Sequence, residues 1–171
     1  MSSVKVAVRV RPFNNRELAL NCQNVVRMYG QKTILSRDSS HLISTPILGK
    51  THQTDEEFNK EFTFDKSYCS FDISDNNFAS QEIVFEDLGK DIVNDAIEGY
   101  NSCIFAYGQT GSGKTHTMMG NADSEGLIPR ICRWLFLQMY SLEKENTEVK
   151  YKTGKFSIFF FFFSLLLFFT N

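Results

Sequence analysis

Residues 108–115 read GQTGSGKT, and this octapeptide is the strongest indicator of the fold in the sequence. It matches G-x-x-x-x-G-K-[ST], the phosphate-binding P-loop motif, at every position. The preceding residues 102–107 form a short, mostly apolar run, which predicts a buried parallel strand. A helix is expected to begin near Gly113. Because a strand before the loop and a helix after it are the context in which this motif binds phosphate, we reject a glycine-rich turn that binds nothing.

Each residue type of the loop has a role in holding an anion. Glycines adopt positive φ and let the backbone approach a ligand closely, so that successive N–H groups form a cradle for phosphate oxygens. The helix that follows adds the positive end of its dipole. Lys114 is expected to reach the β- and γ-phosphates, and the Thr115 hydroxyl is expected to ligate Mg²⁺. The predicted phosphate-binding residues are Gly108, Gln109, Thr110, Gly111, Ser112, Gly113, Lys114 and Thr115, with Thr115 as the metal ligand.

Length and composition exclude several classes of protein. A chain of 171 residues is long enough for one domain with a core. Its net charge of −2 gives no basic field that would attract nucleic acid. The cysteines are widely spaced and form no C-x-x-C pair, which is typical of a reduced, cytosolic protein. Residues 2–11 contain no long apolar stretch, so no secretory signal is expected.

Apolar periodicity predicts alternating strands and helices. Valines at every second position from Val4 to Val10 predict a strand with one apolar face, ended by Pro12. Residues 80–99 predict a helix with Ser80 as N-cap and Gly99 as its stop. Its apolar stripe is expected to pack on a sheet, and the stripe consists of Val84, Phe85, Leu88, Ile92, Val93, Ala96 and Ile97.

The remaining elements complete an α/β pattern, with the ligand at the carboxyl end of a strand. Tyr107 is expected in the core rather than against the ligand. The other expected elements are a loop or short helix over residues 14–24, a hairpin of residues 25–28 and 33–35, surface loops over 37–59 and 70–77, a strand over 61–65, a helix from Lys114 to near Gly120, a helix from Pro129 to about Glu143, and a strand that begins at Val149.

Three strings in this chain resemble the kinesin motor domain. Residues 4–12, VKVAVRVRP, look like its opening strand with the R-x-R-P element. Residues 99–118 resemble the kinesin P-loop segment nearly residue for residue, apart from 102–103, and residues 126–130, GLIPR, are another kinesin-like string. The long loop before Ser80, and Gly120 after two methionines, are most similar to the kinesin-three class of cargo transporters. A small GTPase or a kinase would lack the R-x-R-P strand.

The resemblance covers residues 3 to about 151 and implies a P-loop NTPase-like fold. It also implies ATP and Mg²⁺ as cofactors, microtubules as partner, and a place in the cytoplasm on the cytoskeleton. Arg9 and Pro12 match residues that line the adenine pocket in kinesins, Arg11 completes that element, and His116 contributes a ring that can stack on adenine. The alternatives are solvated strand-edge charges for the two arginines, and a polar helix-surface residue for His116.

One departure from the family puts catalysis in doubt. Kinesins place switch I, N-x-x-S-S-R-S-H, and switch II, D-L-A-G-S-E, after the next strand, and the 171 residues contain neither. Residues 37–41 and 87–89 resemble them only partly and precede the P-loop. Phosphoryl transfer needs an oriented water and neutralised γ-phosphate charge. Two functions therefore stay open: the ATP-binding part of a microtubule-stimulated ATPase, inactive alone, and a non-catalytic nucleotide-binding fragment, membrane-associated through its tail.

The hydrophobic tail, residues 153–171, differs in composition from residues 1–152. Eight of the 17 phenylalanines lie between residues 156 and 169. This stretch would be about 21 Å long as a helix, against about 30 Å for a bilayer core, so a membrane anchor is not expected. Phenylalanine with leucine is what a T-rich tract encodes, and residues 154–156 can be written GGT-AAA-TTT, which contains a splice-donor start. We therefore interpret residues 1–152 as the motor-domain part and the tail as the product of an unspliced intron.

Overall fold

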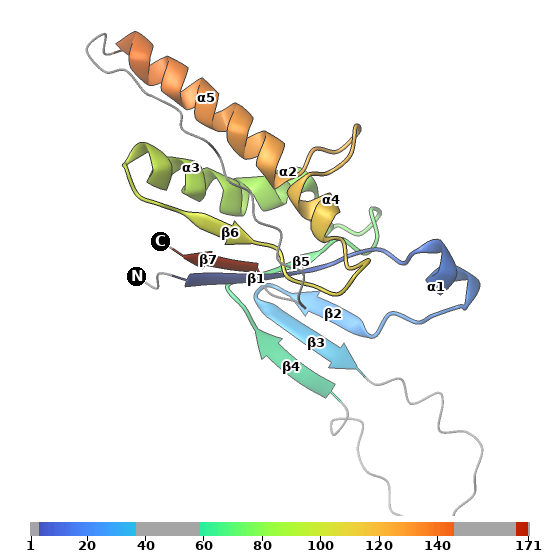
Figure 1. The fold of residues 1–171 in the computed structure, drawn as a ribbon. Coiled ribbons are helices and arrows are strands. Elements are labelled where there is room, and N and C mark those ends of the chain that lie inside the picture. Colours follow the sequence, from blue (N-terminus) through green and yellow to red (C-terminus); the bar gives the residue numbers. More distant parts are fainter. Residues whose placement is uncertain (1–3, 37–58, 146–166, 171) are drawn as a thin grey trace, which may run out of the picture.

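The computed structural model describes residues 4–36, 59–145 and 167–170 (Figure 1). A four-stranded sheet has the order β5-β1-β7-β6, and a three-stranded sheet has the order β2-β3-β4. The strands are β1 (Val4–Val10), β2 (Val26–Tyr29), β3 (Lys32–Ser36), β4 (Asn59–Thr63), β5 (Lys66–Cys69), β6 (Cys103–Phe105) and β7 (Leu167–Thr170). The helices are α1 (Asn15–Ala19), α2 (Gln81–Val84), the π-helical η3 (Phe85–Gly89), α3 (Lys90–Ile97), α4 (Lys114–Met118) and α5 (Leu127–Glu145).

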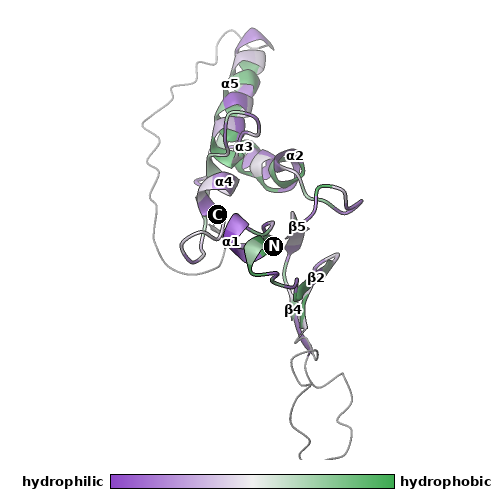
Figure 2. Ribbon diagram, turned by 90° about the vertical axis from the view of Figure 1, so that its right-hand side faces the viewer, coloured by the Kyte–Doolittle hydropathy of each residue, from purple (hydrophilic) through white to green (hydrophobic). Residues whose placement is uncertain are grey.

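The helices α2, α3, α4 and α5 gather on one side of the four-stranded sheet, and the small sheet lies away from them, next to the edge strand β5 (Figures 1 and 2). β1 pairs with β5 in parallel and with β7 in the antiparallel sense, and β6 pairs with β7 in the antiparallel sense. Gln31, in the turn between β2 and β3, links the small sheet to β5. Its side-chain amide donates to the Asp65 carbonyl, and its backbone carbonyl accepts from the Ser67 hydroxyl. This α/β arrangement is the one that the sequence predicts.

The core lies between the helices and the four-stranded sheet. Leu127 of α5, Val84 of α2 and Val93 of α3 are its most completely buried side chains. The sheet contributes Ala7 from β1 and Tyr68 from β5. The remaining members of the cluster are Ala79, Phe85, Leu88, Met118, Ile131 and Leu135. One contiguous apolar cluster therefore joins the helix after the P-loop to the sheet before it.

The helix predicted over residues 80–99 forms, but it is not a regular α-helix. Ser80 caps it, since its Oγ accepts from the Ile83 amide at 3.3 Å. The π-helical segment η3 has more residues per turn than an α-helix. The buried residues Leu88 and Val93 are therefore five positions apart instead of four. Ala96, predicted on the stripe from a spacing of four, is exposed instead.

The strand β1 buries the face opposite to the one that the valine pattern predicts. Ala7 is 3% exposed, whereas the valines of β1 are only half-buried. Ala7 shares its face with Lys5 and Arg9, because side chains alternate along a strand. These two cations find partners on the covering helices, Asp91 of α3 and Gln81 of α2. Polar residues can therefore lie on the helix-covered face, where the alternation rule expects apolar ones.

The strand before the P-loop also differs from its prediction. β6 spans Cys103–Phe105, and Ile104 packs against the core together with Ala106. The alternating side chains Cys103, Phe105 and Tyr107 lie on the other face and are exposed, Tyr107 by 39%. The prediction that Tyr107 is a core residue is therefore wrong. Within the described residues, no element covers that side of β6.

The other elements follow the sequence with small changes. The predicted hairpin is β2 and β3, the loop over residues 70–77 is present, and the predicted short helix in 14–24 is α1. The strand expected over 61–65 is β4, which begins earlier, at Asn59, and a strand that was not predicted, β5, follows it. Most of the loop expected over 37–59 and the strand expected from Val149 lie outside the described residues. Within those residues, no helix is long and apolar enough to cross a membrane.

Truncation of Leu127 in α5 should destabilise the fold strongly. Leu127 is 1% exposed and lies in the core cluster, so Leu127→Ala should lower the free energy of unfolding by about 2–5 kcal/mol. Leu137 of the same helix is 53% exposed, and Leu137→Ala should cost under about 0.5 kcal/mol. Urea unfolding followed by circular dichroism measures both variants. Equal effects of the two substitutions would contradict the placement of the core.

Candidate functional site

The P-loop connects β6 to α4 and depends on its glycines. Gly111 and Gly113 have φ of +80° and +96°, a region that other residues rarely adopt. Gly113 also stands at the N-cap of α4. A Cβ atom at Gly108 would lie 2.1 Å from the Ser112 Oγ, so any other residue at position 108 would force the Ser112 side chain to move. The compact loop that the motif predicts is therefore present.

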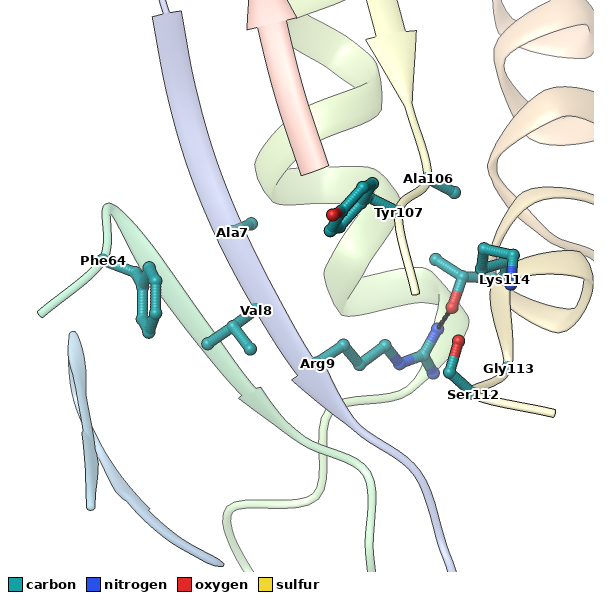
Figure 3. A pocket seen from close by; sticks show the side chains of 10 residues that line it. Ala7, Val8, Arg9, Phe64, Ala106, Tyr107, Ser112, Gly113 and Lys114 are labelled. Atoms are coloured by element: carbon teal, nitrogen blue, oxygen red, sulfur yellow. Dashed lines mark hydrogen bonds between the residues drawn. The ribbon is translucent and has the colours of Figure 1, made fainter. Parts of the chain in front are cut away.

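Lys114 turns back onto the loop that precedes it. Its Nζ donates to the carbonyl oxygens of Gly108 at 2.5 Å and Gln109 at 2.8 Å. Lys114 also lines a small cavity of about 50 Å³, next to Arg9 and Ser112 (Figure 3). This cavity is far too small for a nucleotide. The ammonium group nevertheless lies at the mouth of the loop, where a phosphate could take the place of the carbonyl oxygens as its partner.

Arg9 enters the site from β1 and holds four segments together. Its Nε donates to the Ser70 Oγ at 2.8 Å, and its Nη1 donates to the Gln81 Oε1 at 2.7 Å. Longer bonds reach the Thr117 Oγ1 in α4 and the Ala79 carbonyl, both at 3.3 Å. Burial lowers the pKa of Arg9 from its ordinary value, and Tyr68 opposes this shift. The Arg9 donors therefore bond to other groups of the protein, and a contact of Arg9 with adenine stays a prediction.

Gln81 connects this network to His116. Its Nε2 donates to the His116 carbonyl at 2.6 Å and lies 3.5 Å from the ring Nδ1, while its Oε1 accepts from Arg9. Partial burial and the nearby charge of Arg9 lower the pKa of His116 below its ordinary value of 6.5. The ring is therefore neutral at physiological pH, the form that stacks on a base without carrying a charge to it.

Arg11 fastens the end of β1 to the P-loop. Its Nε donates to the Gly111 carbonyl at 2.8 Å, and its Nη1 and Nη2 each donate to one carboxylate oxygen of Glu17 at 2.7 Å. The Glu17 hydrogen bond raises the pKa of Arg11, whereas the hydrogen bonds from Arg11 and from the Asn14 amide lower that of Glu17 to about 2. Both groups are thus charged at any physiological pH.

A large cavity of about 1220 Å³ opens beside this end of the P-loop. Pockets that hold drug-sized ligands measure about 300–1,000 Å³, so this cavity has room for such a molecule. Its walls come from the end of β1, from α1, from the connection between β5 and α2, and from α4. Six of the predicted residues line it: Arg9, Arg11, Pro12, Ser112, Gly113 and His116. The others, Gly108, Gln109, Thr110, Gly111, Lys114 and Thr115, do not, so the cavity adjoins the phosphate loop without enclosing it.

Sequence reasoning missed several residues of the site. Glu17 could have been found, because Asn14 and Glu17 have the N-x-x-E spacing of a capping box, which the structure contains. Gln81, Ser70 and Thr117 carry no such signal. They contact Arg9 from three segments that are distant in the sequence, and only the fold brings them together.

The residues present fit a magnesium nucleotide. The closely approaching loop backbone suits phosphate oxygens, and the exposed Thr115 can supply one hydroxyl ligand. Within the described residues, no cluster of three or more His, Cys, Asp or Glu side chains could hold a metal alone. Mg²⁺ at phosphates does not need one, because the phosphates and water provide most of its ligands.

Known proteins have sequences similar to that of this chain. Klp98A of Drosophila melanogaster is 50% identical over 147 residues, which are 86% of this chain and 11% of that protein. KIF16B of Homo sapiens is 46% identical over 156 residues, 88% of this chain and 11% of that protein. These relatives belong to the kinesin-three class, as the sequence predicts. The chain thus spans about a tenth of the length of these relatives.

A solved structure has a similar fold. The structure of residues 391–772 of KIF14, with AMP-PNP and in complex with a microtubule, has a TM-score of 0.67 and 39% sequence identity. The match covers 83% of this chain and 34% of that one. A sequence model of the kinesin motor domain matches residues 9–161. This chain therefore belongs to the kinesin motor domain family.

Proposed function

We propose that this chain is the ATP-binding portion of a microtubule-based motor that couples ATP hydrolysis to movement along microtubules. The observation that carries the proposal is the complete P-loop between β6 and α4 in a chain of the kinesin motor domain family. Kinesin motor domains bind ATP and ADP with Mg²⁺ and are cytoskeletal. The similar KIF14 structure holds AMP-PNP on a microtubule. We place this chain on the cytoskeleton, in the cytoplasm.

The two sides of the site have different tasks in this proposal. The loop residues 108–115 bind the phosphates, with Lys114 as point charge and Thr115 as a ligand of Mg²⁺. Arg9, Arg11, Pro12 and His116 form the adenine side. The large cavity supports this division, because it is lined by these four residues and by only two residues of the loop.

The isolated 171-residue polypeptide should bind nucleotide without hydrolysing it. Its sequence contains neither switch motif, so it provides no sensor of the γ-phosphate and no second aspartate for the metal. The alternative function is a non-catalytic nucleotide-binding fragment that associates with a membrane through its tail. Catalysis then belongs to the motor domain with the switch residues included.

Removal of the Lys114 charge should abolish tight ATP binding. Lys114→Ala should weaken the affinity about 100-fold or more, because the phosphates lose a charge-assisted hydrogen bond. Thr115→Ala should weaken only the Mg²⁺-dependent part of the affinity. Lys32→Ala is the matched control, since Lys32 pairs with Glu61 on the small sheet. Titration calorimetry with ATP, with and without Mg²⁺, measures all three variants, and equal affinity of wild type and Lys114→Ala would refute the assignment.

Microtubules should not stimulate ATP turnover by the 171-residue polypeptide. Phosphate release, measured with a coupled assay, should stay at background when polymerised tubulin is added. The positive control is a longer chain of the same protein that includes both switch motifs. Turnover by the short polypeptide that rises with tubulin concentration would disprove its proposed inactivity.

Transcripts of the locus should join the region of Lys152 to an exon that encodes both switch motifs. This expectation follows from the interpretation of residues 153–171 as translated intron. Full-length transcript sequencing tests it directly. Transcripts that all retain the T-rich stretch, together with a matching C-terminal peptide in the proteome, would overturn it.

A further inference from the structure

A line of contacts runs from helix α1 to the P-loop through two side chains. Asn14 and Glu17 form the capping box of α1, in which the Asn14 Oδ1 accepts from the Glu17 amide at 2.9 Å. The Glu17 carboxylate in turn accepts from the Asn14 amide at 2.8 Å and from both terminal nitrogens of Arg11. Arg11 then donates to the Gly111 carbonyl inside the P-loop. The cap of one helix is therefore connected to a loop about 100 residues away in the sequence.

The planarity of the guanidinium makes this connection directional. A guanidinium presents its donors in a rigid fork, so the orientation that meets both Glu17 oxygens also fixes where Nε points. Here Nε points at the Gly111 carbonyl, and Nη1 also meets the Pro12 carbonyl at 2.7 Å. The side chains of Arg11 and Glu17 are only 29% and 28% exposed. Without Glu17, the Arg11 side chain could rotate away from the loop.

The position that Arg11 holds is one that the loop cannot fix by itself. Gly111 has φ +80° and no side chain to pack, and a glycine loses more conformational freedom on ordering than any other residue. Arg11 also flanks Gly113, where a Cβ atom would lie 3.8 Å from the Arg11 Cβ. Arg11 thus restrains Gly111 directly through its hydrogen bond, which lowers the entropic cost of binding a ligand to the loop.

Helix α1 contributes to the wall of the large cavity but not to the core. Its five residues include no buried side chain, so it adds little to the core. What it contributes is a capped first turn that fixes the Glu17 carboxylate. We propose that Glu17 is a positioning residue of the nucleotide site, which acts through Arg11 to hold the P-loop in its binding conformation. The consequence for ATP rests on the proposed function, but the restraint on the loop does not.

Hydrogen–deuterium exchange of the nucleotide-free protein tests the restraint. Glu17→Gln keeps an oxygen for the capping box and removes the charge that orients Arg11. Exchange of the amides of residues 108–113 should become about 3- to 10-fold faster. Glu61→Gln, which breaks the exposed Lys32–Glu61 pair, is the control and should leave these amides unchanged. Unchanged exchange in Glu17→Gln would overturn the proposal, and so would an equal acceleration throughout β1 and α5.

A double-mutant cycle with Arg11→Ala then tests the route to the ligand. ATP affinity, measured by titration calorimetry, should fall about 3- to 10-fold in Glu17→Gln, with little further loss when Arg11 is already absent. Additive losses would show that Glu17 does not act through Arg11 and would overturn the proposal. If exchange accelerates in Glu17→Gln while the wild type binds no ATP, the restraint on the loop stands and the proposed nucleotide function fails.

Discussion

The half-buried guanidinium of Arg9 is the constraint on which the site depends. A cation drawn out of water is costly unless hydrogen-bond partners replace its hydration. Arg9 obtains them from Ser70, Ala79, Gln81 and Thr117, which lie after β5, before α2, in α2 and in α4. The charge can therefore be satisfied only when all these segments have their native positions. Loss of one partner would leave a poorly solvated charge, which couples the geometry of the P-loop helix to that of the sheet.

The sequence predicts the phosphate loop well because local chemistry determines it. Glycines at 108, 111 and 113 report backbone conformations that other residues avoid, and the structure has a close approach or a positive φ at each of them. Ser80 and Asn14 cap their helices for equally local reasons, since each side chain accepts from a backbone amide three residues on. Such features depend on a few neighbouring residues, and a single sequence contains all the information that they need.

Other features could not be predicted, because they depend on what covers each face. The valine pattern of β1 correctly separates its apolar face from its polar face. It does not show that the helices cover the polar face, on which Ala7 is buried. The π-helical turn of η3 shifts the buried stripe by one residue, and no residue type within residues 85–89 signals it. Tyr107 is apolar enough for a core position, yet its side of β6 is open among the described residues. Tertiary packing decides each of these points.

In this structure a strand of the hydrophobic tail, β7, lies between the two halves of the site. The arginines and Pro12 stand at or after the end of β1, whereas the P-loop follows β6, and both strands pair with β7 instead of with each other. Two strand spacings amount to about 9–10 Å. A short side chain on β1 could not cross this distance, but the long side chains of Arg9 and Arg11 can. Arg9 reaches Thr117 in α4, and Arg11 reaches the Gly111 carbonyl. Lysine has comparable length but a single point of charge, so it could not join several partners in fixed directions. The pleat places Arg9 on the face of β1 that the helices cover, and Arg11 follows directly after the strand. Arg9 therefore reaches the helix after the P-loop, whereas Arg11 reaches the loop itself.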